Sequence, residues 1–210
     1  LVGVSKSLSG VFSKLPASGM RDTATPVAAN ATYFIFIIAN SLTGEVDILS
    51  STSPVNPTMP NGFDVKRRIG AILTNGSANI IAFKQYGGVF QFVQPRSMWA
   101  SEAFSANVAI AKTLPIPVGI KVKAQAFVQT SVPSAASYVG FSDPDISIAT
   151  IFNATRSVAA NILDAVIFDG WTDSLARWSF FANYSGTFQS SFCRGWYDPR
   201  GTQGGGDVGF

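Results

Sequence analysis

The sequence predicts an all-β protein, an antiparallel β-sandwich of the jelly-roll kind. Short apolar runs of strand length recur along the chain, separated by turn signals at intervals of roughly 8 to 15 residues. Several runs alternate apolar and polar residues with the period of two that a half-buried strand requires. Helical patterns do not alternate with these runs, so a parallel sheet with crossover helices is not expected. The sequence shows no internal repeat of the kind that predicts a propeller or a solenoid.

The chain of 210 residues is expected to hold one sandwich domain between two irregular ends. Residues 1–30 are rich in Ser, Ala, Gly and Thr and contain two prolines, which is typical of an extended N-terminal arm. The β-sandwich domain is expected over residues 31–200. Residues 201–210 are rich in glycine and are expected to form a flexible tail.

The first strands are expected as a hairpin. The run 33–39, YFIFIIA, is apolar on both faces and predicts a central strand that is covered on both sides. The following SLTG predicts a turn in which Gly44 takes a positive φ. Residues 45–51, EVDILSS, alternate acidic and apolar side chains and predict the partner strand. Three prolines make residues 51–62 a loop, since proline cannot donate to a strand ladder.

The stretch 65–88, VKRRIGAILTNGSANIIAFKQYGG, predicts a second hairpin. Strands are expected at about 67–73 and 79–85. The Asn75-Gly76 pair between them is the strongest short-range signal for a hairpin turn. The YGG sequence then predicts another turn into a strand that begins VFQFVQ.

The clearest alternation lies at residues 119–129, GIKVKAQAFVQ. Aliphatic residues occupy one face, and Lys and Gln occupy the other, with Phe127 as the exception. This pattern predicts a sheet with one face in water. Four further strands are expected in ISIATIFN (146–153), NILDAVIF (161–168), ARWSFFANY (176–184) and GTFQSSFCRGW (186–196). Residues 155–165 also fit a helical period.

Composition excludes several classes of function. Hydrophobic residues make up 47% of the chain and charged residues 13%, about half the usual charged share. Low charge is typical of proteins that pack into assemblies, because few charges repel their neighbours. No apolar run is long enough for a transmembrane helix. A net charge of +3 without a clustered basic face gives no case for nucleic acid.

Histidine is absent, so Ser–His and Cys–His nucleophile pairs and imidazole metal sites are excluded. Cys193 is the single cysteine and cannot form an intrachain disulfide. Arg194 follows it, but adjacent side chains on a strand face opposite ways, so Cys193 is expected to be a small buried residue. No cofactor is expected.

Two acidic pairs lie among turn residues: Asp143 and Asp145 in SDPDI, and Asp169 and Asp173 on either side of GWT. Paired carboxylates can hydrolyse a glycosidic bond or can bind Ca²⁺. In turns, however, Asp more often accepts hydrogen bonds from nearby backbone amides. The turn interpretation is favoured, and neither a catalytic nor a metal-binding residue is assigned.

Several aromatic residues lie in or near predicted loops. Flat rings beside amide and carboxylate side chains suit a sugar, because its C–H face packs on a ring while its hydroxyls form hydrogen bonds. The candidate glycan-binding residues are therefore Tyr86, Trp99, Trp171, Asp169 and Asp173. The alternative is that these rings fill the ends of the sandwich or a subunit interface.

Five segments carry a resemblance to a known family. They are the aromatic strand before Asn40, TGEVDIL, PTMPNGF, KRRIGAILTNGSANI and the later RGWYDPRG. In these segments the chain resembles structural proteins of the tailed-bacteriophage virion, of the tail-fibre or tail-spike type. The resemblance covers about residues 19–95 and 194–201 and does not extend to the middle of the chain.

The resemblance implies a β-rich virion module, commonly a homotrimer, that contacts other virion proteins and host-surface polysaccharide. Such a protein is assembled in the bacterial cytoplasm and ends in the extracellular particle. The expected function is non-enzymatic, with host glycans bound by loop aromatics; three copies of a weak site gain avidity on a repetitive polymer. Two alternatives stay open: a capsid decoration or fibre-stalk protein with a purely structural role, and a polysaccharide depolymerase.

Overall fold

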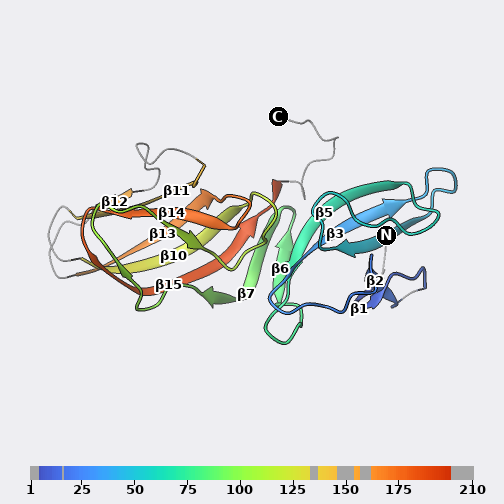
Figure 1. The fold of residues 1–210 in the computed structure, drawn as a ribbon, viewed down its shortest axis with the longest axis horizontal. Helices are drawn as coiled ribbons and strands as arrows, with labels where there is room; N and C mark the ends of the chain where they lie inside the picture. Colours follow the sequence, from blue (N-terminus) through green and yellow to red (C-terminus); the bar gives the residue numbers. More distant parts are fainter. Residues whose placement is uncertain (1–4, 16, 133–136, 146–153, 157–161, 200–210) are drawn as a thin grey trace. The chain divides into compact units, whose positions relative to one another are not determined.

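The computed structural model describes residues 5–15, 17–132, 137–145, 154–156 and 162–199, and these form β-strands joined by turns and loops (Figure 1). The expected all-β class and antiparallel sandwich are confirmed, while the jelly-roll strand order stays a prediction. The chain divides into two compact units, with boundaries at Ile81/Ala82 and Asp198/Pro199. This division differs from the single domain expected over 31–200. Within the described part, no helix is long and apolar enough to cross a membrane.

The first unit contains a five-stranded sheet with the order β1-β2-β4-β3-β5. Its strands are β1 (Ser7–Val11), β2 (Gly19–Arg21), β3 (Thr32–Ala39), β4 (Val46–Ser51) and β5 (Val65–Leu73). Strands β1, β2 and β4 pair in parallel, whereas β3 pairs antiparallel with both β4 and β5. The stretch expected to be an extended arm therefore contributes two strands at one edge of this sheet.

Two glycines allow β1 and β2 to come together. A Cβ atom at Gly19 would lie 2.1 Å from the carbonyl carbon of Gly10 and from the carbonyl oxygen of Val11. Real side chains do not approach a backbone so closely, so only glycine permits this contact. Glycine is uncommon inside strands, so the same residues led the sequence analysis to predict an irregular arm where the structure has two strands.

The hairpin of β3 and β4 is confirmed, with Ile37 opposite Ile48 in an antiparallel register. Gly44 takes the expected positive φ of 70°. The side chain of Asn40 closes the turn, because its Oδ1 accepts hydrogen bonds from the backbone N–H groups of Leu42 and Thr43 at 2.9 and 3.0 Å.

The buried face of β4 carries an acid. Asp47 is 6% exposed and Leu49 is fully buried, whereas Val46 is 43% exposed. The Nζ of Lys6 lies 3.0 Å from the Oδ2 of Asp47, and both side chains are almost completely buried. Lys6 also donates a hydrogen bond to the carbonyl oxygen of Ser13 at 2.6 Å. The acidic residue of EVDILSS therefore points inward because a buried cation from another segment pairs with it.

The expected hairpin over 65–88 forms only next to its turn. Strand β5 ends at Leu73, and beyond it Thr74 bridges Ile80 while the backbone N–H of Ile81 donates to the carbonyl oxygen of Leu73 at 2.8 Å. The expected second strand over 79–85 is wrong. The next strand, β6 (Phe83–Tyr86), pairs with β7 (Val89–Ser97) in a different sheet. The chain thus passes from the first unit to the second where the sequence predicted one hairpin.

The Asn75-Gly76 turn has a different geometry from the one expected. The Oδ1 atom of Asn75 accepts hydrogen bonds from the backbone N–H groups of Ser77 and Asn79 at 2.9 and 3.0 Å. The left-handed residue of this loop is Ala78, with a φ of 61°. The side chain of Asn75 therefore winds a wider loop than a two-residue hairpin turn, as Asn commonly does.

The second unit is a sandwich of two antiparallel sheets (Figure 1). One sheet has the order β13-β10-β15-β7-β6, with β8 paired to β15, and the other has the order β12-β11-β14-β9. The bounds of the remaining strands are β8 (Ala103–Phe104), β9 (Ile110–Thr113), β10 (Lys123–Val132), β11 (Tyr138–Ser142), β12 (Ala154–Arg156), β13 (Ile162–Trp171), β14 (Arg177–Ala182) and β15 (Gly186–Tyr197).

The helix suggested for residues 155–165 is wrong over its described part, since 154–156 and 162–171 are strands. Strands β13, β14 and β15 confirm three of the four late strands predicted from the sequence. The fourth, at 146–153, lies outside the described residues, as does the predicted tail at 201–210.

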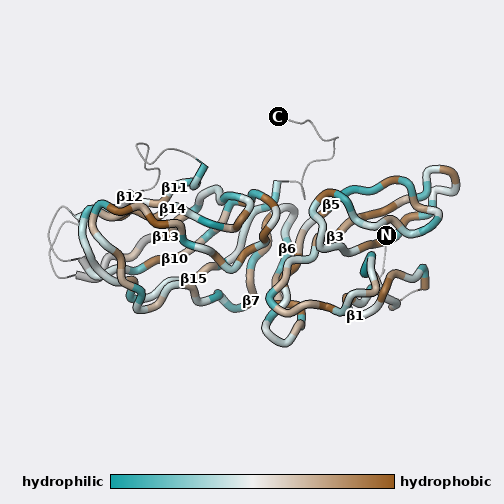
Figure 2. Tube along the Cα trace, viewed as in Figure 1, coloured by the Kyte–Doolittle hydropathy of each residue, from teal (hydrophilic) through white to brown (hydrophobic). Residues whose placement is uncertain are grey.

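Aromatic side chains pack between the two sheets. Figure 2 shows hydrophobic stretches of the chain within strands such as β14. Phe141 of β11 packs on Phe168 of β13 with ring centroids 4.1 Å apart, and Phe180 of β14 packs on Phe188 of β15 at 4.7 Å. The predicted alternation of β10 is confirmed, and its inward residues are almost completely buried: Val122, Ala124, Ala126 and Val128. Small residues on β10 leave room for the rings of the facing sheet.

Candidate functional site

Trp99 is one of the candidate residues, and it lies in the core. Its side chain is 4% exposed, and its Nε1 donates a hydrogen bond to the carbonyl oxygen of Thr113 at 3.0 Å. Its ring stacks on Phe141 with centroids 5.9 Å apart and packs against Phe188 at 5.3 Å. No ring face is left for a sugar, so Trp99 does not belong to the candidate site.

Asp173 serves the turn between β13 and β14. It is 4% exposed, and its carboxylate accepts hydrogen bonds from the backbone N–H groups of Leu175 and Arg177 at 3.0 and 2.8 Å. The guanidinium of Arg177 lies 2.7 Å from the Oδ2 of Asp173. All of these contacts stabilise the turn, which is the role that the sequence analysis favoured for Asp173. Asp173 therefore does not belong to the candidate site.

The second acidic pair is bridged by a lysine. The Nζ of Lys121 lies 3.7 Å from the Oδ2 of Asp143 and forms a hydrogen-bonded ion pair with Asp145. The hydrogen bond to Asp145 raises the pKa of Lys121, so this ammonium group stays charged. Among the described residues, no three His, Cys, Asp or Glu side chains are grouped so that they could hold a metal ion.

Cys193 lies fully buried on β15, and burial raises the pKa of its thiol to about 12. Only the thiolate reacts with thiol reagents, so we expect Cys193 to be labelled very slowly by a disulfide reagent at pH 8 in the native protein. In denaturant its pKa returns to about 8.5 and labelling becomes fast. Equal labelling rates with and without denaturant would show that the thiol is exposed.

The other candidates lie on the outer face of the six-stranded sheet, which is the face turned away from the aromatic core. Directly opposed residues of antiparallel strands point to the same side, so the register defines rows of side chains across the sheet. One such row crosses five of the six strands, from β13 to β6, and we call it the aromatic row: Trp171, Lys123, Tyr197, Val89 and Tyr86. Trp171 is 41% exposed and Tyr86 is 62% exposed.

A second row lies two residues away along each strand, on the same face. We call it the polar row: Asp169, Gln125, Gly195, Gln91 and Lys84. Amide groups thus lie between an acid at one end and a lysine at the other. The outer face therefore presents rings beside hydrogen-bonding groups, the combination that the sequence analysis sought for a sugar.

The backbone geometry explains why the polar row contains a glycine, Gly195. Gly195 has a φ of 153°, and a Cβ atom there would lie 2.0 Å from the carbonyl oxygen of Phe90. Arg194 is an extra residue at this point, because Gly195 and Cys193 pair with consecutive residues of β10. This β-bulge brings the backbone of β15 close to β7 and leaves no side chain at the centre of the polar row.

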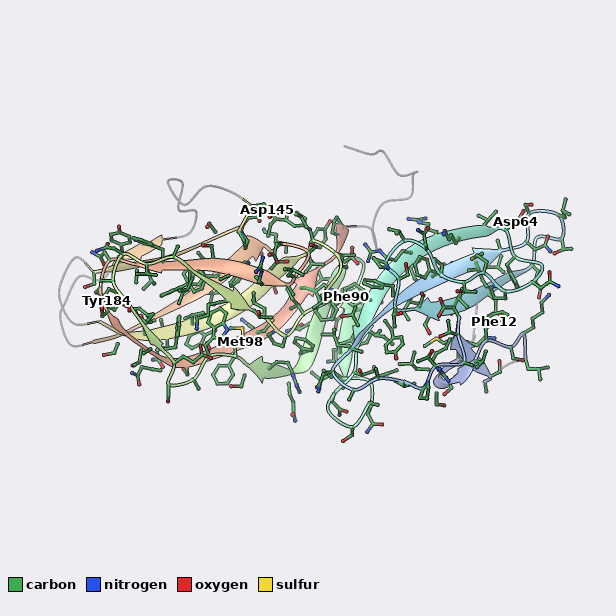
Figure 3. The ribbon with its side chains drawn as sticks, in the orientation of Figure 1. Phe12, Asp64, Phe90, Met98, Asp145 and Tyr184 are labelled. Carbon is green, nitrogen blue, oxygen red and sulfur yellow. The ribbon has the colours of Figure 1, made fainter. Side chains whose placement is uncertain are left out.

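Buried side chains on the opposite face of the same strands anchor the two rows. Phe90, labelled in Figure 3, stacks on Trp196 with centroids 5.0 Å apart and an interplanar angle of 3°. Both rings are buried, and they alternate along their strands with the outward residues Gln91 and Tyr197. At the other end, Phe168 is buried between the outward residues Ile167 and Asp169. The outer side chains therefore project from a backbone that is anchored in a packed core.

An ion pair joins the two rows at the β13 edge. The Nζ of Lys123 lies 3.1 Å from the Oδ2 of Asp169, and both side chains are well exposed. An exposed pair of this kind adds at most about 1 kcal/mol to stability. Its main effect is on orientation, since it holds the carboxylate beside the exposed ring of Trp171.

The two rows span the sheet from edge to edge. Trp171 lies on β13 and Tyr86 on β6, which are the two edge strands. Four strand spacings separate them, about 19 Å. That length fits several linked sugar rings rather than a single one. The structure thus brings Trp171, Asp169 and Tyr86 onto one face, and the sequence analysis missed their neighbours Lys123, Gln91 and Gln125.

No family model matches this chain, and no curated protein or solved structure matches it.

Proposed function

We propose that this chain is a non-enzymatic module of a tailed-bacteriophage virion, tail-fibre-like and trimeric, that helps the particle attach to host-surface glycans. The aromatic row beside the polar row is the observation that carries the attachment role. The resemblance over residues 19–95 and 194–201 supports the placement in a virion. In this proposal the protein works in the extracellular particle and contacts other virion proteins.

The chemistry of the outer face supports glycan binding. The rings of Trp171 and Tyr86 are exposed at the two ends of the aromatic row. The amides of Gln125 and Gln91 provide both donors and acceptors for sugar hydroxyls. Asp169 is the single carboxylate in the two rows, so these rows lack the pair of acids that glycoside hydrolysis uses.

A purely structural role has one observation in its favour. Beyond the polar row, the same face carries exposed apolar side chains: Ile167 at 63%, Val93 at 56% and Phe192 at 39%. Exposed apolar area of this kind is typical of a contact with another protein. In that reading Trp171 would be covered by a second subunit in the assembled particle, and glycans would not bind.

The test of the proposed function is binding of the purified chain to an array of bacterial surface polysaccharides. We expect Trp171→Ala and Tyr86→Ala each to weaken binding about fivefold, since a stacked ring contributes on the order of 1 kcal/mol. Leu42→Ala is the matched control, because Leu42 is 94% exposed and lies in the other unit.

Three results would speak against the proposal. Unchanged binding in both ring variants would remove the outer face from attachment. Absence of binding, with a trimer mass that falls in the ring variants, would favour the purely structural role. Release of reducing sugar from a bound polysaccharide would favour a depolymerase.

A further inference from the structure

We propose that the ligand of the outer face is an acidic polysaccharide, whose carboxylate or phosphate groups bind at Lys84 and Arg194. This inference rests on the proposed glycan-binding function and adds the chemical class of the glycan.

The first observation is which cations of the second unit have partners. Lys112, Lys121, Lys123 and Arg177 each form an ion pair with an acid. Among the described residues, Lys84, Arg96 and Arg194 have no ion-pair or hydrogen-bond partner for their side chains, and all three are exposed. Arg96 lies opposite the inward residue Cys193 in the register, so Lys84 and Arg194 are the two that belong to the outer face. They are therefore cations whose hydrogen-bonding groups are available to a ligand.

The second observation is where these two cations lie. Lys84 ends the polar row on β6. Arg194 is the extra residue of the β-bulge, immediately before Gly195, which occupies the same row on β15. Two strand spacings separate Lys84 from Gly195, about 10 Å. The bulge thus adds an exposed guanidinium beside the middle of a surface that already carries the aromatic row.

The balance of charge on this face is positive. The two rows and the bulge carry three cations, Lys84, Lys123 and Arg194, against the single carboxylate of Asp169. Asp169 is itself paired with Lys123 at 3.1 Å. A ligand that bears anions would complement this field, whereas a neutral glycan would leave Lys84 and Arg194 uncompensated.

The charge is also unevenly distributed along the rows. At the β13 edge the lysine and the acid neutralise each other beside Trp171. The unpaired cations lie toward β15 and β6, about 10 to 19 Å away by strand spacing. This arrangement fits a chain of sugars laid across the strands, with a neutral ring on Trp171 and an anionic group farther along. Arg194 can bind such a group through two N–H donors at once.

The experiment uses the full chain and the polysaccharide that binds best on the array. We compare this polymer with the same polymer after its carboxyl groups are reduced to alcohols, and with a glycerol-phosphate polymer. The comparison distinguishes a carboxylate from a phosphate as the anion. We expect at least fivefold weaker binding to the reduced polymer, and an affinity that falls as salt is added.

The variants are Lys84→Gln and Arg194→Gln. Each is expected to weaken binding of the acidic polymer about five- to tenfold and to weaken binding of the reduced polymer by a clearly smaller factor. Lys66→Gln is the matched control, because Lys66 is an exposed lysine of the other unit.

The failures are distinguishable. Equal binding of the acidic and reduced polymers, still weakened by Trp171→Ala, would overturn the acidic class and leave the proposed function standing. Binding of no polysaccharide would overturn both. Self-association that is lost in Lys84→Gln and Arg194→Gln, without glycan binding, would also overturn both and assign this face to a second copy of the chain.

Discussion

Replacement of Asp47 by Ala is expected to destabilise the first unit by about 3–5 kcal/mol, because it leaves the ammonium of Lys6 buried without a counter-charge. Lys6 and Asp47 are 3.0 Å apart, and their side chains are 3% and 9% exposed. The other partners of Lys6, which include the carbonyl oxygen of Ser13 at 2.6 Å and the hydroxyl of Ser18 at 3.3 Å, carry no negative charge that could neutralise it. The readout is denaturant unfolding followed separately for the two units, for example by amide hydrogen exchange.

The chain provides a matched control on the same hairpin. Glu45 lies two residues before Asp47 and pairs with Lys14 at 2.7 Å, but both of those side chains are well exposed. Glu45→Ala should therefore change stability by less than about 1 kcal/mol. The protection of amides in the second unit should be unaffected in both variants. Equal effects of Asp47→Ala and Glu45→Ala would show that burial of the Lys6–Asp47 pair is not important for stability.

Replacement of Trp178 by Ala should have a similarly large effect in the second unit, about 3–5 kcal/mol. Trp178 is 1% exposed and packs against Phe141 and Phe168 with ring centroids 5.4 and 6.3 Å apart. Its Nε1 donates a hydrogen bond to the carbonyl oxygen of Gly170 at 3.2 Å. The substitution removes this bond and leaves a cavity between the two sheets.

Trp171→Ala is the control for this prediction, since it is the same chemical change 7 residues earlier at a side chain that is 41% exposed. We expect it to lower the free energy of unfolding by about 1 kcal/mol or less. The two tryptophan variants should therefore differ: Trp178→Ala lowers stability, whereas Trp171→Ala leaves stability nearly unchanged and weakens the proposed glycan binding. Similar unfolding midpoints in urea for the two variants would contradict the assignment of Trp178 to the core.

Strand periodicity was sufficient to predict much of the second unit. The alternation along β10 gave the correct inward and outward residues, including Phe127 as the outward exception. The alternation in ARWSFFANY did the same for β14, whose inward residues Trp178, Phe180 and Ala182 are buried. These predictions succeeded because a sandwich strand has one face in water and one face in the core. That difference appears as an alternation of polar and apolar residues in the sequence of the strand.

Long-range pairing was not predictable in this way. The inward face of β4 depends on Lys6, which is 41 residues away in the sequence. The residues after the Asn75-Gly76 loop could in principle pair along the whole of β5. They do not, because the next strand, β6, pairs with β7 instead. A local sequence pattern indicates whether a segment prefers to be a strand, but it does not indicate which of several other strands the segment will pair with.

The candidate site could likewise not be assembled from local sequence patterns. The aromatic row takes one residue from each of five strands, at positions 86, 89, 123, 171 and 197. Rings near predicted loops were sufficient to find Tyr86 and Trp171. Nothing in the sequence near Tyr197, Gln91 or Gln125 links these residues to each other, because only the register of the sheet does so.

The sandwich unit occupies one continuous stretch of the chain, from Ala82 to Asp198. Every strand that contributes to the aromatic row and the polar row lies inside this stretch, whereas the strands of the five-stranded sheet lie before it. A compact unit with its own core can be exchanged as a whole. A single recombination event over residues 82–198 would therefore replace every residue of the outer face at once and leave the sequence of the five-stranded sheet unchanged. If the outer face binds glycans as we propose, its specificity would change in one such step rather than only by point mutation.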